Sequence, residues 1–378
     1  MKILLLSGYD ADSHQFWRLQ LEKQFPEHEW TQLALPARYF QWRIRGSGFI
    51  WGQGDYPELE CHYDLIVVTS MVDWSCLRGM RPNLANIPCV VYFHENQFAY
   101  PMGQQQDRLE PKLVNLYSAC CADQLWFNSR FNRDTFLQGA RQLLSKMPDY
   151  VPPNFVERLQ AISKVVSVPL ADASFQPLSA TRAQSELPEF IWNHRWEYDK
   201  GPEVLLGAVR RLIGRNLKFR LHVVGQQFRR QPEAFETLKQ MLEGTDRMGH
   251  WGYLENINDY HALLSRCHWV VSSAHHDFQG LAVMEAVAKG CIPIVPGHQA
   301  YPEWFGADCY EFEGEVEQDS ASLALKMSQA IEAWPTLPWD EAAQAKRAKV
   351  NPIKSFIWSE QRSIYESALG SVFRHTAP

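Results

Sequence analysis

The stretch His275-His276-Asp277-Phe278-Gln279-Gly280-Leu281-Ala282-Val283-Met284-Glu285-Ala286-Val287-Ala288-Lys289-Gly290 decides the fold of this chain. It follows the apolar run 269–273, which predicts a buried parallel strand, and it leads into a helix that we expect to end at Gly290. A turn with glycine between a strand and a helix presents backbone N–H groups at the positive end of the helix, which suits phosphate. The segment therefore predicts a strand–turn–helix unit of a parallel sheet, with a phosphate-binding turn at Gly280.

Glu285 lies in the middle of this otherwise apolar helix. A carboxylate is unfavourable in such surroundings unless it has a partner or binds a ligand. One interpretation is an ion pair with Lys289, four residues later. The interpretation that we favour is that Glu285 binds sugar hydroxyl groups, one helical turn beyond the phosphate.

The composition is that of a large globular protein. The chain has 378 residues, of which 46% are hydrophobic and 21% charged, so it is long enough for two domains with substantial cores. Its eight cysteines show no CxxC or zinc-type spacing, which indicates buried thiols in a reducing compartment. The first apolar run, 3–6, is too short for a signal peptide, and no segment has the length of a membrane span. We therefore expect a cytoplasmic protein that does not contact membranes.

Short apolar strands alternate with amphipathic helices in both halves of the chain, which predicts two doubly wound α/β domains with parallel sheets. We expect strands at 2–7, 64–70, 89–94, 124–129, 189–193, 218–225, 249–253, 268–273 and 292–295. We expect helices at 13–24, 107–121, 130–145, 201–214, 232–243, 256–266 and 280–289. The predicted organisation is an N-terminal domain over 1–170, a linker over 171–188, a second domain over 189–354, and a last helix within 355–378 that crosses the domain junction. The domains would face each other across a cleft at the carboxyl ends of their strands, where such sheets bind ligands.

The loop 192–202 lies between a predicted strand and a predicted helix. Arg195 and Lys200 in this loop could hold a diphosphate, the guanidinium as a fork and the ammonium as a point charge. The alternative is an exposed loop in which these cations pair with Glu197 and Asp199. The phosphate-binding turn predicted at Gly280 favours the diphosphate clamp.

His94, Glu95 and Asn96 follow an apolar strand of the first domain. This group combines hydrogen-bond donors and acceptors with a histidine, which can hold or relay a proton near neutral pH. A hydrogen-bonded loop without a ligand is the alternative.

The first loop, 7–14, contains Gly8, which could allow close approach by a ligand, and it ends at His14. Ser13 in this loop could cap the following helix. No GxGxxG motif occurs here, which argues against a dinucleotide site of the Rossmann type.

The segment 36–51 contains three arginines, five aromatic residues and no acidic residue. Arg38, Arg43, Arg45 and Trp42 have the chemistry of phosphate contacts and base stacking on looped RNA. The alternative is an aromatic insertion packed on the domain, with its arginines in solvent. The net charge of −6 argues against broad electrostatic binding of nucleic acid, so any RNA contact would be local.

Together these motifs resemble those of the retaining GT-B glycosyltransferases, the large family that includes sucrose and glycogen synthases. Asp277 and Glu285 match the family's Glu-x7-Glu motif, with Asp in place of the first Glu. Arg195 and Lys200 match its Arg-x4-Lys clamp on the donor diphosphate, and His94 matches its histidine near the transferred sugar. Within this group, nearly the whole chain is similar to the tRNA-queuosine mannosyltransferases, through the segments 35–37, 42–45, 92–97, 127–129, 193–200 and 250–254.

The resemblance implies a GT-B fold and transfer of mannose from GDP-mannose to queuosine at the wobble position of a tRNA of the tRNA-Asp type. It implies retention of configuration and no cofactor, and the cationic clamp makes a divalent metal unnecessary. The catalytic residues would be His94, Arg195, Lys200 and Asp277, and the donor would be bound by Arg195, Lys200, Tyr253, Phe278, Gly280, Leu281 and Glu285. From chemistry and position, the acceptor RNA would meet Gly8, His14, Arg38, Trp42, Arg43, Arg45, Glu95 and Asn96. Two other hypotheses are a glycosyltransferase of this fold with another sugar nucleotide and a glycan, lipid or small-molecule acceptor, and a non-catalytic RNA-binding module. The oligomeric state is left open.

Overall fold

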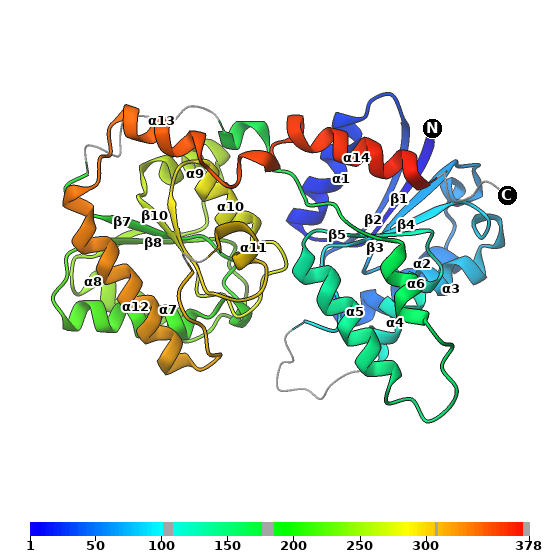
Figure 1. Cartoon of the computed structure of the whole chain (residues 1–378), viewed down its shortest axis with the longest axis horizontal. Coiled ribbons are helices and arrows are strands. Elements are labelled where there is room, and N and C mark those ends of the chain that lie inside the picture. Colours follow the sequence, from blue (N-terminus) through cyan, green and yellow to red (C-terminus); the bar gives the residue numbers. More distant parts are fainter. Residues whose placement is uncertain (101–108, 176–184, 307–308, 373–378) are drawn as a thin grey trace. The chain divides into compact units, whose positions relative to one another are not determined.

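The computed structural model of the chain describes residues 1–100, 109–175, 185–306 and 309–372. The chain forms two compact units (Figure 1). The N-terminal unit comprises residues 1–169 and the C-terminal segment that begins at Trp358, and the second unit comprises Leu170–Ile357. The predicted linker 171–188 falls partly on residues 176–184, which lie outside the described residues.

The N-terminal unit has a parallel six-stranded sheet in the order β2-β1-β3-β4-β5-β6. Its strands are β1 Lys2–Asp10, β2 Glu29–Pro36, β3 Leu65–Thr69, β4 Cys89–Phe93, β5 Gln124–Phe127 and β6 Ser163–Val165. Its helices are α1 Asp12–Gln24, α2 Phe40–Gln53, α3 Trp74–Met80, α4 Leu109–Cys120, α5 Arg130–Leu144, α6 Phe155–Ala161 and α14 Trp358–Val372.

Alternating side chains of these strands enter two apolar layers, because successive strand residues point to opposite faces. Leu4 and Leu6 of β1 pack in one core with Trp51 of α2 and Trp74 of α3.

On the other face, Trp17 of α1 donates from Nε1 to the hydroxyl of Tyr365 in α14 at 2.9 Å. Tyr365 donates in turn to the carbonyl of Ser167 at 3.0 Å. The last helix is thus bonded to the N-terminal unit, while its crossing of a domain junction stays a prediction.

The second unit has a parallel five-stranded sheet in the order β11-β10-β7-β8-β9. Its strands are β7 Glu189–Trp192, β8 Arg220–Val224, β9 Met248–Gly252, β10 Trp269–Val271 and β11 Ile292–Ile294. Its helices are α7 Pro202–Gly214, α8 Ala234–Glu243, α9 Ile257–Arg266, α10 Leu281–Ala288, α11 Tyr301–Phe305, α12 Val316–Ala333 and α13 Glu341–Lys349. Two parallel α/β sheets covered by helices confirm the predicted fold class.

Helix α10 ends as the sequence predicts, because Gly290 just beyond it has φ +90°. The start of the first helix differs from the prediction. Strand β1 continues to Asp10, and α1 begins at Asp12 after Ala11, without a side-chain cap from Ser13. None of the helices in the described ranges is long and apolar enough to cross a membrane.

Candidate active site

The loops that follow β7 and β10 touch each other in the second unit. The N–H of His275 donates to the carbonyl of Asp199 at 2.9 Å. Gly201 has φ +61°, and a Cβ at this position would lie 2.0 Å from the carbonyl oxygen of Ser273. Only glycine tolerates both the conformation and the contact, so the loop composition itself brings these two segments together.

Lys200 is the buried cation at this junction. Its Nζ donates to the carbonyl of His276 at 2.7 Å and pairs with Asp199 at 3.1 Å and with Asp277 at 3.4 Å. Burial alone would lower the pKa of Lys200, but the two carboxylates outweigh burial, so the pKa is raised. Lys200 is therefore charged at neutral pH.

Asp277 is engaged within the protein. Its Oδ2 accepts a hydrogen bond from the hydroxyl of Tyr301 at 2.7 Å, and His194 Nδ1 lies 3.9 Å away. Burial raises the pKa of Asp277, but Lys200 and His194 act in the opposite direction, so the pKa is lowered and the carboxylate is ionised. Asp277 thus positions Lys200 in this structure, and a direct contact between Asp277 and sugar stays a prediction.

His194 and Tyr301 are site residues that we did not predict from the sequence. Burial lowers the pKa of His194 to about 4, so its ring is neutral, and its Nε2 lies 2.9 Å from Ser272 Oγ. Ser272 Oγ also lies 2.9 Å from the hydroxyl of Tyr301. The signal for His194 was its place directly before Arg195, whereas Tyr301 lies too far along the chain from Asp277 to be found from motif spacing.

Gly280 forms the start of α10 as predicted. It has φ +76°, and a Cβ there would lie 2.8 Å from the ring of Tyr301. The first N–H groups of a helix lack intrahelical acceptors, so this turn keeps the donors that an anion needs. Phe278 is buried with its ring against His276, and Leu281 is partly exposed.

Glu285 differs from its predicted setting because its side chain is 23% exposed. The Oε1 atom lies 3.1 Å from both Ser174 Oγ and His261 Nε2, which donate to it. Lys289 Nζ donates instead to the carbonyl of Ala173 at 2.6 Å. The carboxylate is therefore oriented by two donors, and it is accessible to a ligand.

Arg195 and Tyr253 are exposed. Arg195 pairs with Glu197 at 2.8 Å, and its charge lowers the pKa of Lys200, which places it within electrostatic range of that ammonium. Tyr253 follows β9 directly and is 57% exposed. Both interpretations of this loop are therefore compatible with the structure. The cations pair with Glu197 and Asp199, and Lys200 is buried while Arg195 lies at the surface.

In the N-terminal unit, His94 and His14 form a stacked pair. Their ring centroids lie 3.9 Å apart at an interplanar angle of 15°, and the edge of Trp17 closes one side at 4.9 Å. Burial and the neighbouring His14 lower the pKa of His94 well below its usual value, so the ring is neutral. The backbone carbonyl of His94 accepts from Asn128 Nδ2 at 2.8 Å.

Glu95 joins this pair, because its Oε2 lies 3.2 Å from His14 Nε2. Three buried polar atoms around it have no hydrogen-bond partner within the described residues: His14 Nδ1, His94 Nε2 and Glu95 Oε1. Ser7 Oγ, within β1, is likewise buried without a partner in the described ranges. Buried polar atoms are rarely left unsatisfied, and this set combines donors and acceptors, which suits a ligand with hydroxyl groups.

The side chain of Asn96 is engaged within the protein, and its role as an acceptor ligand stays a prediction. The residue is fully buried, and Nδ2 donates to the carbonyl and Oδ1 of Asn132 and to Thr135 Oγ1. Its Oδ1 accepts from the N–H groups of Phe98 and Ala99. These five contacts use the whole amide, so Asn96 shapes the loop after β4.

Gly8 is also structural, because strand β1 extends through it. A Cβ at Gly8 would lie 2.4 Å from the carbonyl oxygen of Met71, and its N–H donates to Thr69 Oγ1 at 3.2 Å. The carbonyl of Met71 therefore makes a close approach to Gly8, and contact between Gly8 and a ligand stays a prediction.

The segment predicted to contact RNA forms α2, and its residues differ in exposure and in their partners. Trp42 is 53% exposed, and its indole lies over Gly46, where a Cβ would come within 2.4 Å of the ring. Arg38 is exposed and lies 5.8 Å from the ring centre of Tyr39. Arg45 pairs with the buried Asp73 at 2.9 Å and with Glu110 at 3.3 Å, and Arg43 is buried. The helix was not predicted, because its glycines disfavour helical structure.

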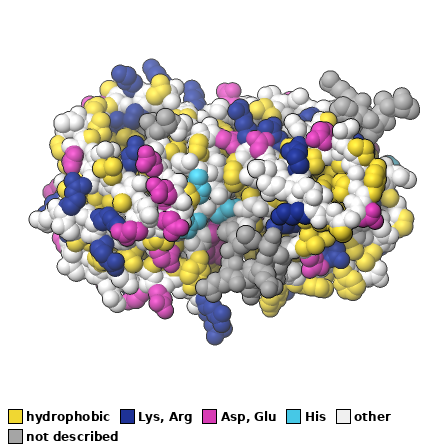
Figure 2. Space-filling view, turned by 60° about the horizontal axis from the view of Figure 1, so that its bottom comes forward, with side chains coloured by type: hydrophobic (Ala, Val, Ile, Leu, Met, Phe, Trp, Pro, Cys, Tyr) yellow, Lys and Arg dark blue, Asp and Glu magenta, His cyan; other side chains and the backbone are white. Residues whose placement is uncertain are grey.

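On the face shown in Figure 2, Lys and Arg side chains are interspersed with Asp and Glu side chains.

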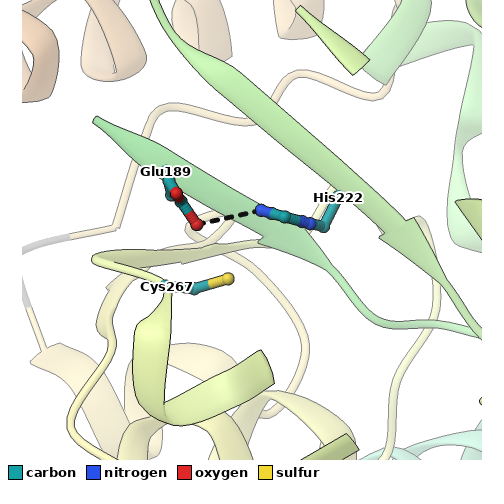
Figure 3. A group of neighbouring side chains, drawn as sticks. All are labelled: Glu189, His222 and Cys267. Atoms are coloured by element: carbon teal, nitrogen blue, oxygen red, sulfur yellow. Dashed lines mark hydrogen bonds and ion pairs between the residues drawn. The ribbon is translucent and has the colours of Figure 1, made fainter. Parts of the chain in front are cut away.

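A separate polar cluster lies at the other end of the second sheet, where the strands begin. In Figure 3, Glu189 and His222 point toward each other, and Cys267 lies beside them. Their potential ligand atoms all lie within 4.8 Å of one another, and no other group of three His, Cys, Asp or Glu residues in the described ranges is arranged so closely. Arg266 Nε, however, donates to Glu189 Oε2 at 2.9 Å, and His222 Nδ1 accepts from the N–H of His250 at 2.8 Å. The guanidinium thus supplies the positive charge that this carboxylate requires.

Comparison with known proteins places these observations in a family. Residues 2–170 match the family described as tRNA-queuosine alpha-mannosyltransferase N-terminal, and residues 179–347 match glycosyl transferases group 1. The tRNA-queuosine alpha-mannosyltransferase of Drosophila melanogaster is 31% identical over 310 residues, which cover 80% of this chain and 81% of that protein.

Solved structures share the fold at low sequence identity. Sucrose-phosphate synthase from Thermosynechococcus elongatus superposes with a TM-score of 0.70 at 16% identity and covers both chains completely. The Anabaena protein HepE in complex with UDP superposes with a TM-score of 0.66 at 15% identity, over 98% of this chain and 100% of that chain. These likenesses confirm the predicted GT-B fold.

Proposed function

Because the chain belongs to the tRNA-queuosine alpha-mannosyltransferase family, we propose that it transfers mannose from GDP-mannose to the queuosine at the wobble position of a tRNA. The hexosyl transfer rests on the family. The donor nucleotide, the identity of the tRNA and retention of configuration are our proposals. The observation that supports a donor site in the second unit is the buried Lys200, held between Asp199 and Asp277 beside the turn that opens α10.

The donor diphosphate would lie against Lys200, Arg195 and the first N–H groups of α10. Negative charge grows on the diphosphate as the sugar leaves, and fixed positive groups stabilise that charge without having to reorganise. Lys200 is already fixed by its two carboxylates, so it is preorganised before the donor binds. This cationic set neutralises the leaving group without requiring a divalent metal.

The sugar and ribose of the donor would meet Glu285, with Phe278 and Leu281 beside the phosphates and Tyr253 near the base. Glu285 is held by Ser174 and His261, and its carboxylate retains acceptor capacity for hydroxyl groups. Carboxylates repel phosphates, so this residue suits the hydroxyl side of the donor.

The acceptor diol would bind at the group formed by His14, His94 and Glu95. Two vicinal hydroxyls carry both donors and acceptors, which matches the unsatisfied atoms of these three side chains. Because His94 is neutral, it positions the mannose or the diol by hydrogen bonds and does not act as a cation. In the same-face reaction that we propose, the leaving phosphate oxygen accepts the proton of the attacking hydroxyl.

The deciding experiment incubates the purified protein with queuosine-containing bulk tRNA and a panel of sugar nucleotides, followed by mass spectrometry of the digested nucleosides. We expect one hexose to be added to queuosine with GDP-mannose and not with UDP-galactose or UDP-glucose. Hexose addition with a UDP-sugar would contradict the proposal that GDP-mannose is the donor. Slow hydrolysis of GDP-mannose without any modified nucleoside would support the proposed donor site. It would contradict the proposal that queuosine is the acceptor.

A further inference from the structure

Arg43 is a buried cation for which the described part of the chain supplies no carboxylate partner. The residue is only 6% exposed, and its Nε is buried without a hydrogen-bond acceptor among the described residues. Arg45, two residues later, has carboxylate partners, because it pairs with Asp73 and Glu110. Burying a guanidinium without a counter-charge is unfavourable, so Arg43 stands in a position that a bound anion would stabilise.

The first turn of α2 places Arg43 near the carboxyl edge of the N-terminal sheet. Its neighbour Ile44 packs with Met71, which follows the end of β3, and with Val114 of α4. One turn further along the same helix face, Ser47 Oγ donates to the carbonyl of Met71 at 3.2 Å. The helix is therefore anchored where β3 ends.

Two other buried donors without partners lie on the residues that flank this anchor. Ser70 precedes Met71, and neither its Oγ nor Gln97 Nε2 has a hydrogen-bond partner in the described ranges. Asn115, next to Val114, joins them: its Nδ2 donates to the carbonyl of Ser70, and its Oδ1 accepts from the N–H of Gln97, both at 2.9 Å.

The three unsatisfied groups, Arg43 Nε, Ser70 Oγ and Gln97 Nε2, can all donate a hydrogen bond. These three donors lie on segments that meet at the end of β3, and one of them carries a positive charge. They differ from the mixed set at His14, His94 and Glu95, and they suit an oxyanion rather than a diol. Guanidinium groups match phosphate oxygens in charge and in geometry.

We propose that Arg43, Ser70 and Gln97 form a socket for one phosphate group of the acceptor RNA backbone, an assignment that rests on the proposed function. The socket would hold the polynucleotide in register, whereas His14, His94 and Glu95 would bind the diol of the modified base. It predicts that the enzyme distinguishes a queuosine nucleotide within RNA from the free nucleoside, which carries no phosphate.

The test compares Arg43→Met with the wild type on two acceptors, a queuosine-containing anticodon stem–loop and free queuosine. We expect the KM for the stem–loop to rise at least about tenfold, the size of one lost charge-assisted hydrogen bond, and the KM for the nucleoside to stay unchanged. The melting temperature should stay equal or rise, because the variant removes an uncompensated charge. Arg141→Met, which removes an exposed arginine paired with Glu157, is the matched control. Equal losses on both acceptors, or a lowered melting temperature, would show a structural role and overturn the socket.

A binding measurement separates this proposal from the proposed function. The affinity for an unmodified anticodon stem–loop is measured against salt concentration, and Arg43→Met should reduce the slope by about one released counterion. If Arg43→Met reduced this slope although the wild-type protein transferred no sugar, the phosphate socket would be supported and the proposed function would be contradicted. An unchanged slope in an active enzyme would overturn the socket alone.

Discussion

Lys200 Nζ lies 3.4 Å from Asp277 Oδ1, so the cation expected to hold the donor diphosphate and the first acid of the family motif form one buried ion pair. Replacing Lys200 by Met leaves Asp277 and Asp199 without their cation. We expect a loss of about 3–5 kcal/mol in unfolding free energy and transfer reduced at least about a thousandfold. The double variant K200M/D277N should regain much of the stability and none of the activity. Denaturant unfolding and transfer assays check this, and a K200M protein as stable as the wild type would contradict it.

The pH dependence of transfer should show no ionisation of His94 between pH 6 and 8. Burial and His14 lower the pKa of His94 well below its usual value, so the residue is neutral throughout this range. We expect His94→Asn to lower kcat without changing the shape of the kcat/KM profile. If the kcat/KM profile of the wild type changed with pH near 6.5 and this change disappeared in the variant, proton transfer would be assigned to His94.

The exposed indole of Trp42 should act as a stacking platform for a base of the acceptor. Base–aromatic stacking contributes about 1–3 kcal/mol, so Trp42→Ala should raise the KM for tRNA by roughly 5- to 150-fold. Steady-state kinetics on tRNA and on the donor separate the two substrates, and the KM for the donor should not change. Tyr150→Ala, which removes another exposed aromatic side chain, is the control. Equal effects of both variants would rule out a specific platform.

Gly8 should be required for stability and not for ligand contact. A Cβ there meets the Met71 carbonyl at 2.4 Å, so Gly8→Ala should destabilise the protein by about 1–3 kcal/mol. Gly79, in α3, has no atom within 4 Å of an added Cβ, so Gly79→Ala should stabilise by about 0.5–1 kcal/mol. Thermal unfolding measures both, and a Gly8→Ala variant with normal stability but a raised KM would restore the ligand interpretation.

The second unit should lose stability in mild acid through His298. Its ring stacks on Phe312 at 3.5 Å, and burial lowers its pKa to about 4. Because the folded pKa lies below the unfolded value of about 6.5, the stabilisation is complete above pH 6.5 and is lost as the pH falls toward 4. The loss from this residue amounts to roughly 3 kcal/mol. His298→Gln should flatten the slope of unfolding free energy against pH, whereas His62→Gln, at an exposed position, should not.

The strand–turn–helix units could be predicted because their signals are local. The apolar run 269–273, Gly280 at the turn and Gly290 after the helix specify the unit within the twenty-two residues 269–290. Helix α2 escaped prediction because Gly46 and Gly48 lower helix propensity, and packing overrides that propensity. A Cβ at Gly48 would lie 2.7 Å from the Asp73 carbonyl, so the glycine serves helix contact rather than a turn.

The chemistry of the site was partly visible in the sequence and partly not. Arg195, Lys200 and Glu285 have the expected spacing, and the structure adds how each is held. The arginines of α2 look alike in sequence, yet Arg43 is buried without a carboxylate partner among the described residues, while Arg45 is paired. Whether an arginine is paired depends on residues distant in sequence, so composition alone could not separate them.

By itself, the sequence determined the α/β class, the strand ends that carry the polar clusters and the family of the chain, because each depends on periodicity or on residues close in sequence. The tertiary structure decided the partners of those residues. Tyr301 holds Asp277 from 24 positions away, and His14 reaches Glu95 from 81 positions away. Burial and ionisation state depend on such distant contacts, so the neutral His94, the charged Lys200 and the unsatisfied Arg43 exist only in the folded chain.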